Sequence, residues 1–444
     1  MKKLVYLFSL LLVLAACNRG PQKKTYNWQE DLHYRLLTDF CLDRSQVKTY
    51  IRKYIPDVTD AQMDQWEMND KLEFMVIDGK KRYFKNAGPN LFRLDSLCSE
   101  IKQKKEGKRI EACDTEDMIN LPEIIDSVKR SGSFVVCPKR MRVTYTLTVD
   151  TNAVPAGKMI RCWLPYPRRD CKRQTGIKLI SASEQDYLIS SPSTMHSTLY
   201  MTKMSLPGQP TVFSETFEFT SWGEWYNLRP ARILPYDTTT VMYKKYTAER
   251  NTHIHFSPRL RALADKLTAG ESNPLLKARR IFRWISERFP WASAREYSTI
   301  KNIPEYVLDH HHGDCGQVSL LFITLCRICG IPAHFQSGFM MHPNDVGMHD
   351  WAEVFFQGVG WVPVDQSFGI PEYGKSAEES GFFLGGIDSW RLIVNNDYSM
   401  PLTPKKKYPR SETVDFQRGE VEWEGGNLYF PQWNYRIEVS YLNF

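Results

Sequence analysis

Several features that would identify a protein class at once are missing from this sequence. After the first seventeen residues, no stretch is both long and apolar enough to cross a bilayer as a helix. The net charge is only +7 over 444 residues, and the densest basic run, Lys405 to Lys407, is typical of a solvated loop. These absences argue against a membrane-embedded body and against nucleic acid as a partner.

Metal-binding signatures are missing as well. Six of the ten histidines fall between His310 and His349, but their spacings match no common zinc pattern. A solvated loop explains the run His310 to His312 more simply than a metal site does. We therefore expect neither a metal nor another cofactor.

The ten cysteines leave more than one use open. An exported protein could pair several of them, and the connectivity cannot be read from their spacing. Cys326 and Cys329 are three positions apart, as in redox or metal motifs, but the surrounding run is hydrophobic. Two small apolar core residues are the interpretation that we favour for this pair.

The first seventeen residues form a targeting segment. Lys2 and Lys3 precede a short apolar run from Leu4 to Leu14, and small residues then lead to Cys17. This arrangement resembles a bacterial lipoprotein signal, which implies cleavage before Cys17 and lipid on its thiol. The alternative is an ordinary secretory signal in which Cys17 falls by chance. The resemblance places the mature protein in the cell envelope, anchored to a membrane and facing the periplasm or the cell surface.

Length and composition predict several folded domains. Without the signal, the chain is long enough for roughly two to four domains, and 42% hydrophobic and 13% aromatic residues suffice for real cores. We expect an α+β protein with four regions after the signal peptide of residues 1–17. They are a mixed helical region at 18–130, a β-sandwich at 131–250, a catalytic core at 251–398 and a C-terminal β-hairpin at 399–444.

The region before residue 131 shows local structural signals but no catalytic constellation. Trp28 to Phe40 has helical spacing, with Leu32, Leu36 and Leu37 on one side. Asp78-Gly79 between two strand-like runs predicts a hairpin with a type I′ turn. The region could be a spacer, a docking domain or a substrate-binding domain.

Short strands at turn-rich intervals follow. The alternation from Arg142 to Val149 is the clearest, and Thr240 to Tyr246 is the last strand predicted before the core. Near the C-terminus, Val414 to Trp423 and Trp433 to Leu442 have the composition of two strands joined by a glycine turn. We expect these two strands to pair as a hairpin that packs on an earlier sheet.

The segment from His312 to Gly316 places a cysteine after a Gly-Asp turn. An apolar run from Val318 to Cys329 follows and predicts a buried helix, so Cys315 would lie in its first turn. Unpaired N–H groups and the positive end of the helix dipole favour a thiolate there. His349 and Asp365 each lie at one end of a short β-like run. His349 could accept the thiol proton, and Asp365 could orient the histidine.

These residues belong to four sequence blocks that occur in order. The blocks are Gly313-Asp314-Cys315, Gly330-Ile331-Pro332-Ala333, His349-Asp350-Trp351-Ala352-Glu353 and Gly360-Trp361-Val362-Pro363-Val364-Asp365. Over residues 255–398 the chain thereby resembles the transglutaminase-like cysteine superfamily.

The resemblance implies a papain-like catalytic core with Cys315 as nucleophile, His349 as its base and Asp365 as the orienting carboxylate. It also offers Trp291 as an oxyanion donor, although a packing tryptophan would occupy the same place. Two residues depart from the family pattern: His334 stands where relatives carry arginine, and Gln366 stands where proline is common. Neither belongs to the triad, and both bear on the shape of the cleft.

The expected function is acyl transfer through a thioester, on amide bonds of proteins, peptides or cell-wall peptides. Water as the acceptor gives a peptidase or amidase, and a lysine amine gives a crosslinking transglutaminase. Nothing in the sequence signals a crosslinking partner, so we favour hydrolysis. The alternative is a non-catalytic binding module for protein or glycan recognition, which the loss of a triad residue would have supported; none is lost.

Overall fold

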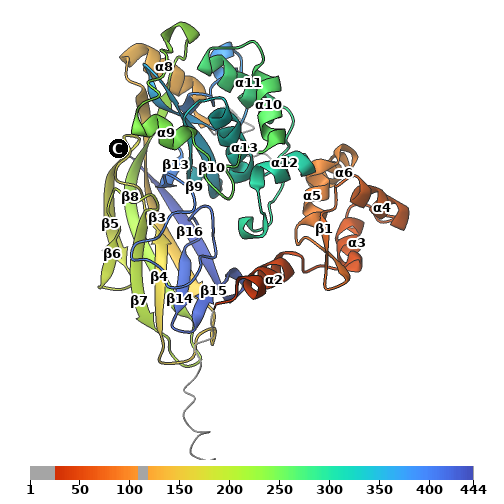
Figure 1. Cartoon of the computed structure of the whole chain (residues 1–444). Helices are drawn as coiled ribbons and strands as arrows, with labels where there is room; N and C mark the ends of the chain where they lie inside the picture. The colour runs from red at the N-terminus through yellow and green to blue at the C-terminus, as the bar shows by residue number, and fades with distance from the viewer. Residues whose placement is uncertain (1–25, 109–118, 444) are drawn as a thin grey trace, which may run out of the picture.

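The computed structural model describes residues 26–108 and 119–443, so the signal segment and Cys17 lie outside the described residues. Figure 1 shows a small N-terminal domain on one side, a helix-covered sheet at the top and two long sheets below it. Within the described part, no helix is long and apolar enough to cross a membrane.

The N-terminal domain has a core of its own, which runs from Phe40 to Cys98. Its elements are α2 (Trp28–Asp39), α3 (Arg44–Arg52), α4 (Asp60–Met68), β1 (Phe74–Ile77), β2 (Lys80–Tyr83), α5 (Ala87–Leu94) and α6 (Ser96–Glu106). The predicted hairpin is confirmed: β1 pairs with β2, and Asp78 and Gly79 both have positive φ, as a type I′ turn requires.

Helix α2 forms where predicted, but it buries its polar side. Asp31, Arg35 and Asp39 are its buried residues, whereas Leu36 and Leu37 are only partly buried. Each buried group has a partner: Asp31 pairs with Arg35 at 2.8 Å, and Asp39 pairs with Lys85 at 2.9 Å. The helix lies between the N-terminal domain and the rest of the molecule (Figure 1). Its polar side is buried there, although the apolar spacing predicted burial of the opposite side.

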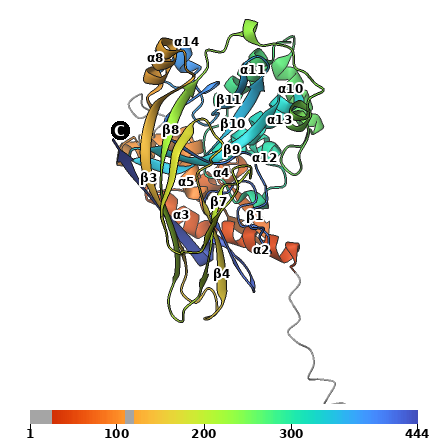
Figure 2. The same cartoon turned by 90° about the vertical axis from the view of Figure 1, so that its left-hand side faces the viewer.

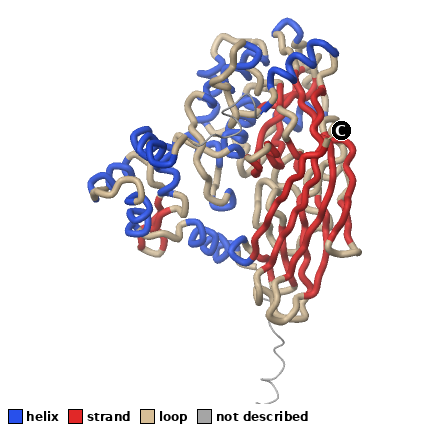
Figure 3. Tube along the Cα trace, turned by 180° about the vertical axis from the view of Figure 1, so that it is seen from behind, coloured by secondary structure: helices blue, strands red, loops and turns tan. Residues whose placement is uncertain are grey.

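Two five-stranded sheets pack face to face and share one hydrophobic core (Figure 3). One sheet has the order β12-β8-β3-β16, with β5 also on β8, and the other has the order β15-β14-β4-β7-β6. The first comprises β3 (Val135–Val149), β5 (Gln174–Ala182), β8 (Thr211–Trp225), β12 (Gly386–Ile387) and β16 (Trp433–Leu442). The second comprises β4 (Met159–Pro165), β6 (Tyr187–Ile189), β7 (Thr198–Met204), β14 (Glu420–Trp423) and β15 (Gly426–Leu428).

The remaining sheet is antiparallel, with the order β11-β10-β9-β13. Its strands are β9 (Ala333–His342), β10 (Asp345–Phe356), β11 (Gly360–Val364) and β13 (Arg391–Asn395). Figure 2 shows the helices gathered on one side of it: α10 (Pro258–Thr268), α11 (Pro274–Ser286), α12 (Ile303–His310) and α13 (Cys315–Ile328). Ala352 and Val354 of β10 share a core with Leu321 and Leu325 of α13, so the sheet supports that helix directly.

The expected region 18–130 divides into two parts. Helix α8 (Leu121–Ser131) buries Leu121, Ile124 and Val128 in the large core of the helix-covered sheet, not in the N-terminal domain. The prediction of a strand from Thr240 to Tyr246 is wrong, because this segment is a helix. It is helix α9 (Val241–Thr247), because the Thr240 side chain caps the Tyr243 N–H and lysines occupy the last turn.

The predicted C-terminal hairpin between Val414–Trp423 and Trp433–Leu442 does not form. β14 instead pairs with the adjacent β15, which is the nearest partner after a two-residue turn. β16 crosses to the other sheet and pairs with β3 from Trp433 opposite Val149 to Leu442 opposite Arg140. The open edge of the long β3 strand offers β16 far more backbone partners than β14 could.

The histidine run is not a solvated loop. His310 ends α12, His311 has a φ of 55° that closes the helix, and His312 is buried. Burial lowers the pKa of His312 to about 4, which keeps its ring neutral.

Candidate active site

Cys315 is the first residue of α13, as predicted. Asp314 caps the helix: its carboxyl accepts from the Gln317 N–H at 3.0 Å, and Gln317 Oε1 accepts from the Asp314 N–H at 3.1 Å. Gly316 leaves room for this arrangement, because a Cβ there would lie 2.3 Å from the Tyr297 hydroxyl and 2.6 Å from Asp350 Oδ2. The capping box fixes the nucleophile at a helix start.

His349 of β10 meets Asp365, which directly follows the neighbouring strand β11. Nε2 of His349 lies 2.8 Å from Oδ2 of Asp365, and both side chains are buried. Burial lowers the pKa of His349, and the charge of Asp365 offsets part of that effect. The ring is therefore neutral at neutral pH, with Nε2–H donating to the carboxylate and Nδ1 left as a proton acceptor.

A buried cation behind Asp365 completes this pair. Nη1 of Arg391 lies 3.0 Å from Asp365 Oδ2, and Nη2 lies 2.6 Å from Asp388. His342 approaches the same Asp388 at 3.0 Å. Although burial opposes ionisation, His349 and Arg391 lower the pKa of Asp365, so its carboxylate stays charged. The sequence carries one signal for this network: Asp388 and Arg391 are charged residues within an otherwise apolar run.

The thiol of Cys315 has a different partner from the one expected. Its hydrogen bond goes to Oδ2 of Asp350 at 3.4 Å, and none to His349 is found in residues 26–108 or 119–443. Asp350 follows His349 in β10, so their side chains leave the strand on opposite faces. The structure thus joins His349 with Asp365, and brings Cys315 against the next residue of the same strand.

The pKa of the Cys315 thiol is raised, contrary to the low value expected at a helix start. Burial is the largest cause, and the nearby carboxyl groups of Asp350 and Asp314 add to it. The Asp350 backbone N–H acts in the opposite direction, which places the sulfur beside the peptide unit that follows His349. Asp350 and its partner Gln417, whose Nε2 donates to Asp350 Oδ1 at 2.9 Å, are site residues that the sequence did not reveal.

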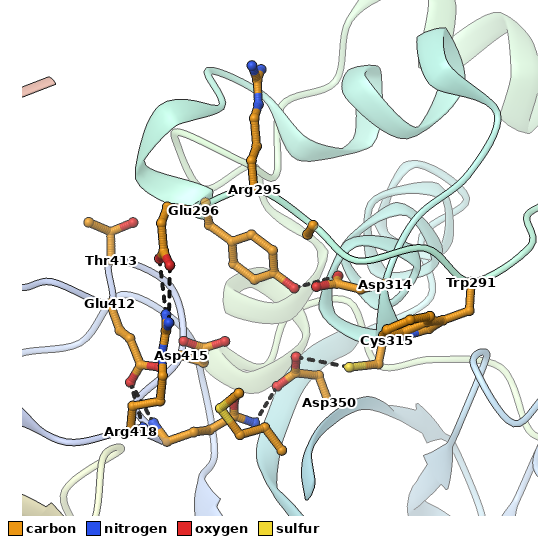
Figure 4. A pocket seen from close by; sticks show the side chains of 14 residues that line it. Trp291, Arg295, Glu296, Asp314, Cys315, Asp350, Glu412, Thr413, Asp415 and Arg418 are labelled. Atoms are coloured by element: carbon orange, nitrogen blue, oxygen red, sulfur yellow. Dashed lines mark hydrogen bonds and ion pairs between the residues drawn. The ribbon is translucent and has the colours of Figure 1, made fainter. Parts of the chain in front are cut away.

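A cavity of about 190 Å³ opens beside the thiol (Figure 4). Trp291 lies at its rim next to Cys315 and is 42% exposed. Backbone hydrogen bonds hold this segment to the nucleophile turn: the Ala292 N–H donates to the Gly313 carbonyl, and the Gly313 N–H donates to the Pro290 carbonyl, both at 3.3 Å. Trp291 therefore lies beside Cys315 at the rim of the cavity, and its role as an oxyanion donor remains a prediction.

The two residues that depart from the family pattern both find partners. Gln366 accepts a hydrogen bond from Ser319 of α13 at 3.2 Å, which ties the nucleophile helix to the segment after Asp365. Nε2 of His334 lies 3.1 Å from Glu353 on the neighbouring strand. Among the described residues, no group of three or more histidine, cysteine or acidic side chains could hold a metal ion.

A cysteine at the start of a helix, packed on an antiparallel sheet that carries a histidine–aspartate pair, defines a papain-like cysteine fold. Residues 261–366 match the family model of the transglutaminase-like superfamily. Residues 1–18 match the prokaryotic membrane lipoprotein lipid attachment site, so the protein is exported and lipid-anchored.

Two curated relatives share part of the chain. A Haemophilus influenzae protein without an assigned function is 26% identical over 175 residues, 33% of this chain and 44% of its own. A protein-glutamine gamma-glutamyltransferase from Pseudomonas aeruginosa is 25% identical over 130 residues, 26% of this chain and 19% of its own. The match thus spans less than half of either relative.

Two solved structures are also similar. One is a Cytophaga hutchinsonii protein provisionally described as a cysteine protease, with 14% identity and a TM-score of 0.46, covering 70% of this chain and 93% of its own. The other is the periplasmic domain of TgpA from Pseudomonas aeruginosa, with 15% identity and a TM-score of 0.27, covering 56% of this chain and 92% of its own.

Proposed function

We propose that the protein is a cell-envelope enzyme that transfers acyl groups through a thioester on Cys315. Its substrates are amide bonds of proteins, peptides or cell-wall peptides, and water is the favoured acceptor, which makes it a peptidase or amidase. The observation that carries the proposal is the His349–Asp365 pair at 2.8 Å, because His349 directly precedes Asp350, the residue that the Cys315 thiol contacts. Catalysis of this kind needs a nucleophile, a base and a group that orients the base.

In the resting enzyme the thiol donates to Asp350 and is protonated. In the proposed reaction the sulfur leaves Asp350 and reaches Nδ1 of His349. Because Asp350 and His349 leave β10 on opposite faces, this step requires a shift of β10 against the start of α13. Nδ1 takes the thiol proton, and Asp365 stabilises the resulting imidazolium through Nε2. The thiolate then attacks the amide carbon and forms a tetrahedral oxyanion.

The oxyanion needs donors at the start of α13. As the first helical residue, Cys315 has a backbone N–H without an intrahelical acceptor, and Trp291 lies beside it. The imidazolium of His349 gives its proton to the departing amine, which leaves a thioester on Cys315. Water attacks this thioester with His349 as base, and the acid and the free thiol are released.

A second candidate is a non-catalytic recognition module. One specific observation favours it: the thiol is held protonated by Asp350 and is not engaged by the imidazole. In that case the fold would use the cavity for binding alone, and His349 and Asp365 would serve only as a buried polar pair.

Alkylation of Cys315 by iodoacetamide across a pH series separates the two candidates, with each cysteine followed by mass spectrometry. The enzyme predicts that His349→Ala slows labelling of Cys315 at pH 7 by about tenfold or more, because the proton acceptor is lost. Met348→Leu, which changes an uncharged wall of the same cavity, should leave the rate unchanged. Equal rates for the wild type and His349→Ala would favour the recognition module.

A reactive Cys315 then allows a screen of peptides and cell-wall fragments with a fluorescent primary amine present. Free acid as the product indicates hydrolysis, and the fluorescent amine in the product indicates crosslinking.

A further inference from the structure

Acidic groups dominate the cavity beside Cys315. Five carboxyl groups and two guanidinium groups line it. Both arginines are committed to other partners. Arg418 binds Glu296 through both oxygens, at 3.0 and 3.1 Å, and Glu412 at 2.7 Å.

Arg295, the second arginine, points away from the cavity (Figure 4). It lies 3.7 Å from Glu73 and 5.0 Å from the centre of the Tyr306 ring. Three carboxyl groups near the thiol, those of Asp314, Asp350 and Asp415, therefore have no cationic partner among the described residues.

Asp415 is the member of this trio that points to a ligand. It is only 8% exposed and lines the cavity opposite Asp314 and Asp350 (Figure 4). Its carboxyl group forms no hydrogen bond or ion pair with any residue that the structure describes, whereas Asp314 accepts from Tyr297 at 2.6 Å and Asp350 accepts from Gln417. A buried carboxyl without a hydrogen-bond partner is costly, and the charges of Arg418 and Arg410 offset only part of that cost.

In the free protein, protonation of these carboxyl groups replaces pairing with a cation. Burial raises the pKa of Asp314 to about 6. Burial and the neighbouring acids also raise the pKa of Asp350 and of Asp415. A compact cation in the cavity would let these groups ionise and would bind to them strongly, because the surroundings screen charge poorly.

We propose that this cavity is a subsite for a protonated primary amine carried by the acyl-donor substrate; the proposal rests on the function proposed for Cys315. The volume of about 190 Å³ suits an ammonium group on a short stem. The amine belongs to the donor because Asp350 holds the thiol before any acyl group is attached. An acceptor, which arrives after the thioester has formed, comes too late to release it.

This arrangement couples binding to activation. An ammonium group shared by Asp350 and Asp415 competes with the thiol for the Asp350 carboxyl. Once Asp350 is released, the thiol can give its proton to His349 in the shift of β10 proposed above. Substrates that bear an amine near the scissile carbonyl would therefore activate the nucleophile that attacks them.

Three small thiosulfonate reagents of different charge test the subsite: 2-aminoethyl (cationic), methyl (neutral) and 2-sulfonatoethyl (anionic) methanethiosulfonate. Rates at Cys315 are divided by those at the exposed Cys41 of the same molecule, measured by mass spectrometry. We expect the cationic reagent to label Cys315 faster than the anionic one, with a lead in relative rate of about tenfold or more. Asp415→Asn should remove most of this lead while changing the neutral rate little, and Met348→Leu should preserve it.

The outcomes separate the two proposals. If the neutral reagent does not label Cys315 in the folded protein, the proposed function fails. If it labels Cys315 but charge makes no difference, only the amine subsite fails. Asp415→Ser replaces Asp415→Asn if thermal unfolding shows that the latter is not folded.

A second measurement assigns the amine to donor or acceptor. The initial burst of 4-nitrophenol from glycine 4-nitrophenyl ester is compared with that from 4-nitrophenyl acetate. We expect Asp415→Asn to slow the glycine burst selectively. If Asp415→Asn instead slows only the steady-state release of 4-nitrophenol after the burst, the subsite binds the amine of the acceptor. That result would overturn the assignment to the donor.

Discussion

Asn90 and Ser293 exchange two hydrogen bonds across 203 positions of the chain. Nδ2 of Asn90 donates to the Ser293 carbonyl at 2.9 Å, and the Ser293 N–H donates to Asn90 Oδ1 at 3.0 Å. The segment that Asn90 holds runs from Trp291 to Tyr297 and forms one wall of the Cys315 cavity. The N-terminal domain thus contacts the wall of the site, although it contributes no lining residue.

Three further contacts bind the same segment. Arg93 lies over the Trp291 ring at 4.8 Å, Glu73 lies 3.7 Å from Arg295, and Asp39 accepts from the Glu296 N–H at 2.6 Å. These contacts hold the N-terminal domain against the segment that walls the Cys315 cavity.

The first prediction concerns this contact. Asn90→Ala leaves the Ser293 backbone groups without their partner and should destabilise the docked wall by about 1–3 kcal/mol. Hydrogen exchange of residues 291–297 should accelerate while exchange in α13 stays slow. Gln103→Ala, on the exposed side of the same domain, is the matched control. Unchanged exchange in the segment would show that Asn90 does not position it.

The second prediction concerns the thiol. Asp350→Asn removes a carboxyl that raises the pKa of Cys315, second in effect only to burial. That pKa should fall, so the pH profile of iodoacetamide labelling should move to lower pH and labelling at pH 7 should speed up. The shift is measured on Cys315 alone, with Cys41 as the internal standard. A profile displaced to higher pH would contradict the carboxyl effect.

The third prediction concerns the buried ion network. Arg391→Met leaves Asp365 and Asp388 without their cation and should destabilise the protein by about 3–5 kcal/mol. Because the folded state lowers the pKa of both carboxyls, their contribution to stability is present above their unfolded values and is lost as the pH falls. The thermal unfolding temperature of the wild type should therefore fall on acidification. Arg436→Met, at an exposed pair, should change little.

The fourth prediction concerns Glu215, which lies in the core between the two long sheets. It is 1% exposed, and neither of its carboxyl oxygens has a hydrogen-bond partner within residues 26–108 and 119–443. Burial raises its pKa, so the folded protein loses stability as the pH rises from the unfolded pKa toward the folded one.

Glu215→Leu should consequently stabilise the protein at neutral pH, and the gain should shrink near pH 4. The comparison is thermal unfolding at the two pH values. Glu218→Leu on the same strand is the contrasting control: its pKa is lowered by Arg142 and Arg140, so removing it should bring no such gain. A neutral or negative effect of Glu215→Leu at pH 7 would mean that the carboxyl has an unseen partner.

Local chemistry made part of this molecule predictable. The Asp78-Gly79 turn and the helix start after Asp314 follow from backbone conformation and capping within a few residues. Cys315 at a helix start and His349 near Asp365 followed from a motif with a fixed spacing.

The predictions failed where residues far apart in the sequence determine the local structure. The polar side of α2 is buried because Arg35 reaches the carbonyls of Arg410 and Ser411, far along the chain. β16 leaves its sequence neighbour because β3 has an open edge. The thiol meets Asp350 through the register of β10 against α13, which no periodicity in the sequence encodes.

The pairing of β3 with β16 has a consequence for how the protein is made. The first long sheet begins at Val135 and acquires its last strand only at Trp433, so the transglutaminase-like domain is an insertion within it. A chain that threads outward through a translocation pore presents β3 long before its partner arrives. Until then β3 has a bare edge that invites pairing with foreign strands. Arrival of the C-terminal strand is therefore the step that seals the fold, and a chain cut short after the active site would carry Cys315 on an unfinished scaffold.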